Sequence, residues 1–327
     1  MKRTRLLPAM LSLFAIVALV LGCNKTISGP DEEVEEEDVL ITFASTRAFT
    51  TLANAGEIYT MNPDGSNPRR ITNNEVDDRQ PNLSPDRSKI VFSRGLPNHP
   101  EQEIYVMNVD GSGEKRLTDN DVNDQMPVFS PDGSKIVFMS LRDNNPELYV
   151  MDADGSNVRR ITNHAGEDAY PSWSPDGTKI VFTRDGDIHV VNADGSGSAQ
   201  RLTSDPAYEY KPSWSPDGSR IAFAVQLGDP TVTPFHHEVW SMNANGSDVT
   251  NLTPKPDDVA ENDWDNRWPV WSRTGDYIYF QSVRPASVRD EGAPHPTAFE
   301  IFRMNPDGSN PINLTKTAGV DATPDVR

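Results

Sequence analysis

The sequence has one cysteine, one long apolar run and too few basic residues to balance its acids. Cys23 is the only cysteine among 327 residues, so no internal disulfide can form and stability must come from packing. With 49 acidic and 30 basic residues the formal net charge is −19, which argues against nucleic acid or an anionic membrane surface as partner and favours cations or basic surfaces. The sequence also contains no Gly-x-Ser-x-Gly segment, the nucleophile elbow of many serine hydrolases.

The long apolar run occupies residues 6–21, follows three basic residues and is too short to span a bilayer comfortably. Val20-Leu21-Gly22-Cys23 resembles the lipobox of bacterial lipoproteins. This resemblance implies that residues 1–22 are a signal peptide and that Cys23 carries a lipid. The alternative is an ordinary secretory signal followed by a leftover thiol, but a single cysteine at this junction is better explained by lipidation.

We predict that residues 23–38 form an acidic tether. The block Asp31–Asp38 contains seven acids and one apolar residue, and such blocks repel themselves and stay extended. Its main interpretation is a solvated spacer. The alternative is an export signal for the cell surface, because some surface lipoproteins carry acids close behind the lipidated cysteine.

The remaining chain repeats one unit, which is shortest in residues 170–203. Four short runs rich in β-branched and aromatic residues alternate with the turn signals Ser174-Pro175-Asp176-Gly177, Asp185-Gly186 and Asp194-Gly195, which predicts a four-stranded antiparallel meander. Alternation places Ile180 and Phe182 on one face of the second strand, where they would pack with Trp173 against a neighbouring sheet.

The repeat predicts an all-β fold, a six-bladed β-propeller over residues 39–327. A period of roughly 40–60 residues with four strands each is typical of propeller blades, since one such sheet cannot bury its faces alone. Residues 39–45 match a second strand with no first strand before it, and residues 321–326 match a first strand with nothing after it. We therefore expect the N- and C-terminal strands to pair and close the ring.

Two motifs carry a family resemblance. The Ser-Pro-Asp-Gly-x-x-Ile-x-Phe segment, followed by Tyr-x-Met-Asn/Asp-x-Asp-Gly-Ser and Arg-Arg-Ile-Thr, resembles the WD40-like (PD40) repeat of TolB-type propellers over nearly all of residues 39–327. This resemblance implies the propeller fold but leaves the function open. Two repeats depart from it, because Arg87 replaces the turn glycine in one and Ser272-Arg273-Thr274-Gly275 replaces Ser-Pro-Asp-Gly in another.

The first-to-second and third-to-fourth strand turns are nearly identical among repeats, whereas the other connections vary and must emerge on the opposite face. We expect that variable face to carry function. Near it, three residues before each first-strand proline, five of the six repeats have an acid and the sixth has an amide: Asp78, Asp124, Asp168, Glu209, Asn266 and Asp321. One interpretation is a funnel at the channel mouth for a basic peptide end or Ca²⁺. The other is structural pairing with the arginines that end the second strands.

The longest insertions, residues 226–237, 255–267 and 284–297, belong to the last two complete repeats and should be neighbours on the variable face. They could form a wall beside the channel mouth, for which binding or mutual packing are the two interpretations. Its candidate binding residues are Phe235, His236, His237, Trp264, Arg284 and His295.

The sequence favours a lipid-anchored extracytoplasmic scaffold, on the outer membrane or the cell surface rather than the inner membrane. We expect it to bind an envelope protein or peptide, to be monomeric, to touch membrane only through its lipid, and to bind no nucleic acid. No motif supplies a catalytic residue, a metal centre or a required cofactor, with Ca²⁺ the one alternative occupant. An enzyme acting on envelope or extracellular polysaccharide through acids near Asp257–Asp265 is the second hypothesis, and a purely structural envelope protein is the third.

The substitution Cys23→Ser tests the predicted lipidation directly. Because lipid would be attached to the thiol, the variant should move from the membrane fraction to the soluble extracytoplasmic fraction. Fractionation and immunoblotting measure this shift, and Asn24→Ser provides the neighbouring control. Retention of Cys23→Ser in the membrane at the unmodified level would contradict lipidation.

Overall fold

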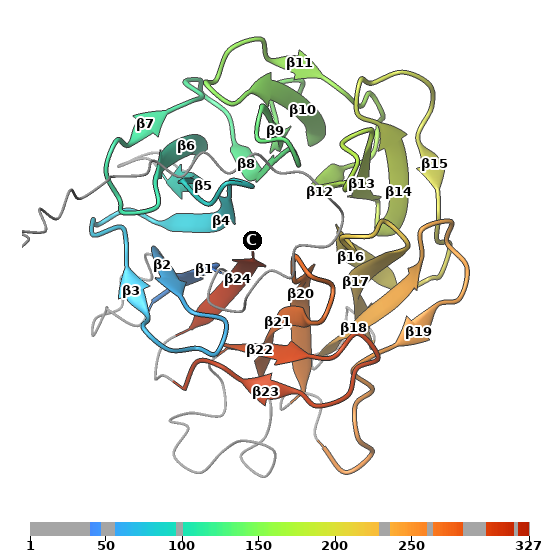
Figure 1. Ribbon diagram of the computed structural model, residues 1–327. Coiled ribbons are helices and arrows are strands. Elements are labelled where there is room, and N and C mark those ends of the chain that lie inside the picture. The colour runs from blue at the N-terminus through green and yellow to red at the C-terminus, as the bar shows by residue number, and fades with distance from the viewer. Residues whose placement is uncertain are drawn as a thin grey trace, which may run out of the picture. The chain divides into compact units, whose positions relative to one another are not determined.

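The computed structural model describes residues 40–46, 56–95, 101–228, 236–259, 264–283, 299–316 and 320–326. Every regular element in these ranges is a β-strand, and the strands form six four-stranded sheets (Figure 1). Within each sheet, neighbouring strands pair antiparallel. The predicted all-β, six-bladed propeller is therefore confirmed.

The strands occupy four positions from the channel outward. The innermost strands are β24 (Asp321–Val326), β4 (Asp78–Leu83), β8 (Asp124–Phe129), β12 (Asp168–Trp173), β16 (Tyr208–Trp214) and β20 (Asp265–Trp271). The second strands are β1 (Ile41–Ser45), β5 (Lys89–Gly95), β9 (Lys135–Ser140), β13 (Lys179–Arg184), β17 (Arg220–Leu227) and β21 (Ile278–Val283). The third strands are β2 (Glu57–Met61), β6 (Gln102–Asn108), β10 (Glu147–Asp152), β14 (Asp187–Asn192), β18 (His236–Asn243) and β22 (Glu300–Met304). The outermost strands are β3 (Arg69–Arg70), β7 (Lys115–Arg116), β11 (Arg159–Arg160), β15 (Gln200–Arg201), β19 (Thr250–Asn251) and β23 (Ile312–Asn313).

We number the blades 1 to 6 by their second strands, so that blade 1 contains β1 and blade 6 contains β21. The turns between innermost and second strands mark the turn face of the propeller. The connections from second to third strands and from one blade to the next mark the opposite, loop face. Innermost strands run from the loop face to the turn face.

The two ends of the propeller sequence complete blade 1. Strand β24 pairs with β1 in the register Ile41 to Val326 and Ser45 to Asp321. Figure 1 shows the first and last strands side by side between β4 and β20. The predicted ring closure by the terminal strands is confirmed.

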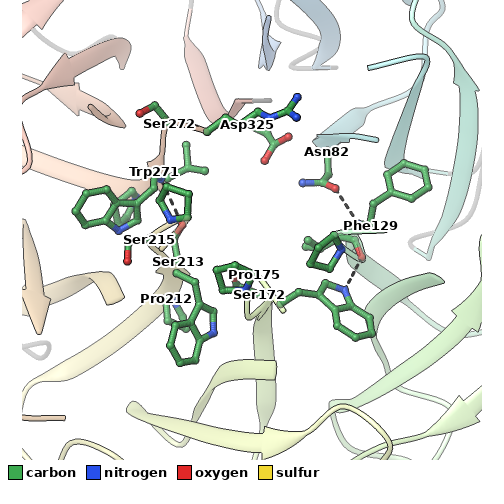
Figure 2. A pocket seen from close by; sticks show the side chains of 18 of the residues that line it. Asn82, Phe129, Ser172, Pro175, Pro212, Ser213, Ser215, Trp271, Ser272 and Asp325 are labelled. Atoms are coloured by element: carbon green, nitrogen blue, oxygen red, sulfur yellow. Dashed lines mark hydrogen bonds between the residues drawn. The ribbon is translucent and has the colours of Figure 1, made fainter. Parts of the chain in front are cut away.

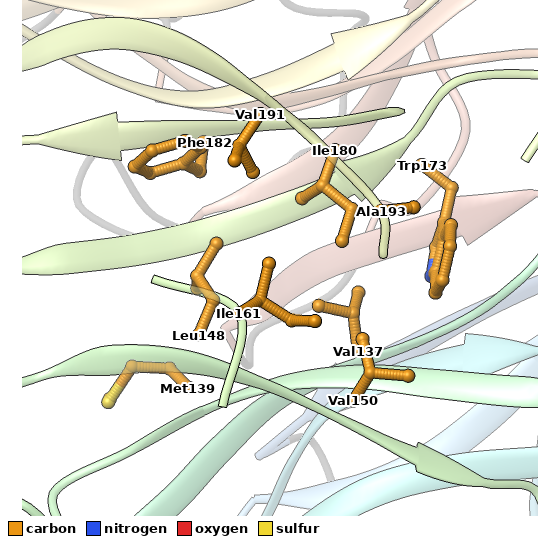
Figure 3. Packing of buried hydrophobic residues seen from close by; sticks show 10 residues of the cluster. All are labelled: Val137, Met139, Leu148, Val150, Ile161, Trp173, Ile180, Phe182, Val191 and Ala193. Carbon is orange, nitrogen blue, oxygen red and sulfur yellow. The ribbon is translucent and has the colours of Figure 1, made fainter. Parts of the chain in front are cut away.

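Apolar side chains fill the spaces between blades, as Figure 3 shows for blades 3 and 4. Trp173, Ile180 and Phe182 of blade 4 pack against Val137 and Leu148 of blade 3. The next residue along β13, Val181, faces blade 5 instead. The predicted alternation therefore gives each central strand two buried faces.

A repeated acid at the start of the third strand fixes the outermost strand. In blade 3 the Glu147 carboxylate accepts hydrogen bonds from Thr162 Oγ1 at 2.5 Å and Arg160 at 2.6 Å, while Thr162 Oγ1 accepts from the Leu148 amide at 3.0 Å. Burial alone would raise the pKa of Glu147, but these hydrogen bonds and one from the His164 amide lower it below its usual value. This network explains why Arg-x-Thr recurs after the outer turns.

Removing residues 321–327 should destabilise the whole domain. The truncation would delete β24 and leave β1 as an unpaired edge next to the cores of blades 2 and 6, so we expect a loss of several kcal/mol and a tendency to aggregate. Thermal unfolding with light scattering measures both effects, and a chain lacking only Arg327 is the control. Equal melting temperatures for the two truncated chains would contradict a stabilising closure.

Candidate functional site

Each innermost strand has a bulge immediately before its proline. The register shifts there in all six blades, and the residue before the proline is left-handed, with φ between 52° and 58°. Residues other than glycine pay roughly 1–2 kcal/mol for this conformation. The six residues are Gln80, Met126, Tyr170, Lys211, Trp268 and Thr323.

These six side chains help to line a small cavity in the channel, which we call the constriction. Its volume is about 30 Å³, room for about one or two water molecules. Their side chains differ in chemistry around the ring. Tyr170, Lys211 and Trp268 come from three consecutive blades, so one half of the constriction is aromatic and carries a cation.

An aromatic cluster extends from this half toward the loop face. Ring centroids lie 5.6 Å apart for Tyr170 and Trp268, 5.6 Å for Tyr170 and Tyr210, and 5.9 Å for Tyr208 and Tyr210. The Lys211 ammonium lies 5.2 Å from the Trp268 ring centroid. Burial raises the pKa of Tyr170 to about 12, so its phenol is neutral, and Tyr208 keeps 42% of its surface exposed.

A buried ionic group supports this cluster. His237 lies edge-on to Tyr210 and its Nδ1 is 2.9 Å from Asp265 Oδ1, while Arg267 donates to both Asp265 oxygens at 2.7 and 2.5 Å. Burial lowers the pKa of His237 despite this carboxylate, so the imidazole is neutral near pH 7. Burial alone would raise the pKa of Asp265, but His237 and Arg267 hold it below its usual value.

The recurring acids all lie at the loop-face end of the innermost strands, but none presents its side chain to solvent. Asp78, Asp124, Asp168, Asn266 and Asp321 are 0% exposed and Glu209 is 4% exposed. Arg94 donates two hydrogen bonds to Asp78, at 2.6 and 2.9 Å. Arg184 donates two to Asp168, both at 2.6 Å.

In the other blades, Arg142 pairs with Asp124 at 2.9 Å, Ser282 donates to Asn266 and Ser45 donates to Asp321. The geometry matches the pairing interpretation at Asp78, Asp124 and Asp168. Ligand binding by these residues stays a prediction, and it would require their buried contacts to open.

Glu209 is the exception among these acids. Val225 lies opposite Glu209 in the strand register, at the position where blades 2 and 4 have arginine. The Glu209 Oε2 atom is buried and has no hydrogen-bond partner. Burial, which Asp187 and Asp205 reinforce, raises the pKa of Glu209 to about 7 although Thr203 donates to it. Blade 5 therefore carries a buried carboxyl group whose charge is not compensated by an ion pair in the described residues.

The predicted wall residues are only partly within the described ranges. His236 is buried with its Nε2 3.3 Å from Glu238 Oε1, and Trp264 is buried with its Nε1 donating to the Thr253 carbonyl at 3.1 Å. His237 makes the Asp265 contact given above. Cys23, Phe235, Arg284 and His295 lie outside the described residues. The binding roles of all these residues stay predictions.

A larger cavity lies on the turn-face side of the constriction (Figure 2). It has a volume of about 340 Å³ and is walled by turn prolines, by Trp173, Trp214 and Trp271, and by a few polar groups. This cavity lies on the face opposite to the variable face, where the sequence predicts function. The residue after each first-strand proline was the available signal, because these residues line it: Asn82, Val128, Ser172, Ser213, Val270 and Asp325.

A family profile described as the TolB beta propeller domain (PD40) matches residues 93–266, more than half of the chain. The chain belongs to this family. No curated protein sequence matches it significantly.

Solved TolB-type structures share the fold of this chain. TolB from Acinetobacter baumannii is 23% identical with a TM-score of 0.67, covering 89% of this chain and 67% of that one. A putative TolB from Agrobacterium tumefaciens is 21% identical with a TM-score of 0.61, covering 88% and 97%. Oligogalacturonate lyase from Vibrio parahaemolyticus is 15% identical with a TM-score of 0.51, covering 85% and 73%.

Within the described ranges of this TolB-type propeller, no three His, Cys, Asp or Glu side chains gather in a way that could hold a metal ion. The Ca²⁺ alternative has no such ligand group there. The same ranges contain no helix that is long and apolar enough to cross a membrane.

Glu209→Gln should change how stability depends on pH. The folded-state pKa lies above the unfolded value, so Glu209 costs nothing below about pH 4.5, and its cost grows as pH rises toward 7 and is complete above that. The variant should therefore be more stable than the unmodified chain at pH 8, by up to about 3 kcal/mol, and equal to it near pH 4.5. Denaturant unfolding across this range measures the difference.

The matched control is Asp78→Asn, which breaks an ion pair at the equivalent position. It leaves the Arg94 guanidinium, whose side chain is 11% exposed, without its main partner. Stability should fall at neutral pH by about 1–3 kcal/mol. A pH-independent effect of Glu209→Gln, or a loss like that of Asp78→Asn, would show that the Glu209 charge is compensated.

Proposed function

We propose that this TolB-type propeller is a lipid-anchored extracytoplasmic scaffold that binds an envelope protein or peptide through its loop face at the channel mouth. The aromatic cluster of Tyr170, Tyr208, Tyr210 and Trp268 carries the proposal. It joins three adjacent blades at the mouth, and Tyr208 is exposed. Aromatic residues and arginine are enriched where proteins bind one another, and rings packed on a rigid scaffold lose little entropy on binding.

The exposed acids beside Tyr208, at the outer end of the cluster, favour a basic partner group. Glu167 and Asp185 are exposed and lie near enough to Tyr208 to raise its pKa, after the larger effect of burial. Asp205, three residues before Tyr208, is exposed too. With a net charge of −19 for the chain, this arrangement would attract a partner that presents lysine or arginine.

The path of the chain suits an anchor at Cys23. Ile41 starts β1 opposite Val326, at the turn-face end of blade 1. The described part of the propeller therefore begins at the turn face, opposite the loop face. An anchor that precedes it would leave the aromatic cluster on the other face available to a partner.

The test is cross-linking of the full chain in its own cell envelope, followed by purification and identification of the linked species. A defined protein should be linked, and Tyr208→Ala combined with Glu167→Gln should reduce its yield about tenfold, because a hot-spot residue contributes roughly 1–2 kcal/mol. Val249→Ala is the control, since Val249 is 47% exposed at an outer turn.

Equal yields from all three chains would contradict binding at the loop face. Release of new sugar ends from an envelope polysaccharide by the purified chain, abolished by Asp265→Asn, would support the enzymatic alternative instead.

A further inference from the structure

One blade places a carboxylate in the lining of the turn-face cavity, at a position where the other five blades have none. Asp325 occupies the position after the innermost-strand proline, where the other blades have Asn, Val or Ser. It is only 6% exposed, and its Oδ2 accepts a hydrogen bond from the Leu83 amide at 2.9 Å. Its other oxygen has no hydrogen-bond or ion-pair partner among the described residues. Asp325 thus brings one uncommitted acceptor to the cavity wall.

A cation replaces a proline on the rim of the same cavity. Blades 2 to 5 place a turn proline there, namely Pro85, Pro131, Pro175 and Pro216, whereas blade 6 places Arg273. Arg273 is exposed, and within the described ranges its guanidinium makes neither a hydrogen bond nor an ion pair. The two opposite charges line one cavity without pairing with each other.

The remaining lining suits a small ligand with a peptide backbone. Figure 2 shows the Asn82 amide nitrogen turned toward the cavity, while its oxygen accepts from the Phe129 amide at 2.8 Å. Ser172 adds a hydroxyl group, and the tryptophans and prolines supply apolar walls. About 340 Å³ lies near the lower end of the range for small-molecule sites, about 300–1,000 Å³.

We propose that this cavity binds a short peptide of about two to three residues with both ends free. The ammonium end of the peptide lies at Asp325 and its carboxylate end at Arg273, while its side chains contact the tryptophan and proline walls. Two opposite charges that line one cavity without pairing complement a zwitterion better than a cation or an anion, since a ligand with a single charge would be repelled by the like charge of the site. This site lies across the constriction from the proposed protein-binding face and does not depend on it.

Titration calorimetry of the full chain with Gly-Phe-Gly tests this assignment. The peptide with free ends should bind, and either N-acetylation or C-terminal amidation should weaken binding about tenfold, the effect of losing one charge-assisted hydrogen bond. Asp325→Asn keeps an acceptor for the Leu83 amide, so the fold should persist while discrimination against the acetylated peptide disappears. Arg273→Gln should abolish discrimination against the amidated peptide only.

Asp276→Asn and Arg87→Gln are the controls, because both residues lie in equivalent turns but do not line the cavity. They should leave both discriminations intact, as should Tyr208→Ala on the loop face. No binding at about 10 mM, equal affinity for free and blocked peptides, or equal effects of cavity and control variants would overturn the proposal.

Discussion

A four-stranded blade has an inner edge with unpaired backbone groups, and in this propeller such edges from six blades meet around one channel. The edges cannot pair with one another, so side chains from the neighbouring blade satisfy them. Asp325 accepts from the Leu83 amide, Asn82 from the Phe129 amide and Gln80 from the Met126 amide. The bulge before each proline brings these groups into place, and it also turns the preceding side chain into the channel.

Departures from the repeat concentrate in the blades that place polar, charged and aromatic side chains at the channel. Blade 5 lacks the arginine that pairs with the buried acid, and blade 6 has an amide in place of that acid and Arg273 in place of a turn proline. The same two blades, with blade 4, contribute the aromatic cluster. A repeat maintained for packing needs none of these changes, and sites of function are where local rules are expected to be broken.

The sequence predicted the blades because their signals are local. Turn residues and period-two alternation set each strand, and the unmatched segments at 39–45 and 321–326 set the closure of the ring. The bulge was not predictable in the same way, because residues such as Tyr170 and Lys211 read as ordinary extended positions until the register is known. One shifted residue reverses which face a side chain occupies. The sequence shows the recurring acids, but their burial was not predictable, because Asp78, Asp124 and Asp168 are buried against arginines 16 to 18 residues away in the chain. The turn-face cavity was missed because its lining comes from all six innermost strands at once.

The closure of blade 1 also determines how the domain responds to mechanical load. A pull on the segment before Leu40 acts along β1, which is flanked by β24 on one side and β2 on the other. A force directed along β1 runs perpendicular to its hydrogen bonds with both partners, so these bonds would be loaded together in shear and not opened one after another. Any force that reaches the propeller through the preceding segment would therefore act on a strand that is held from both sides, and one of its two partners is the last strand of the fold.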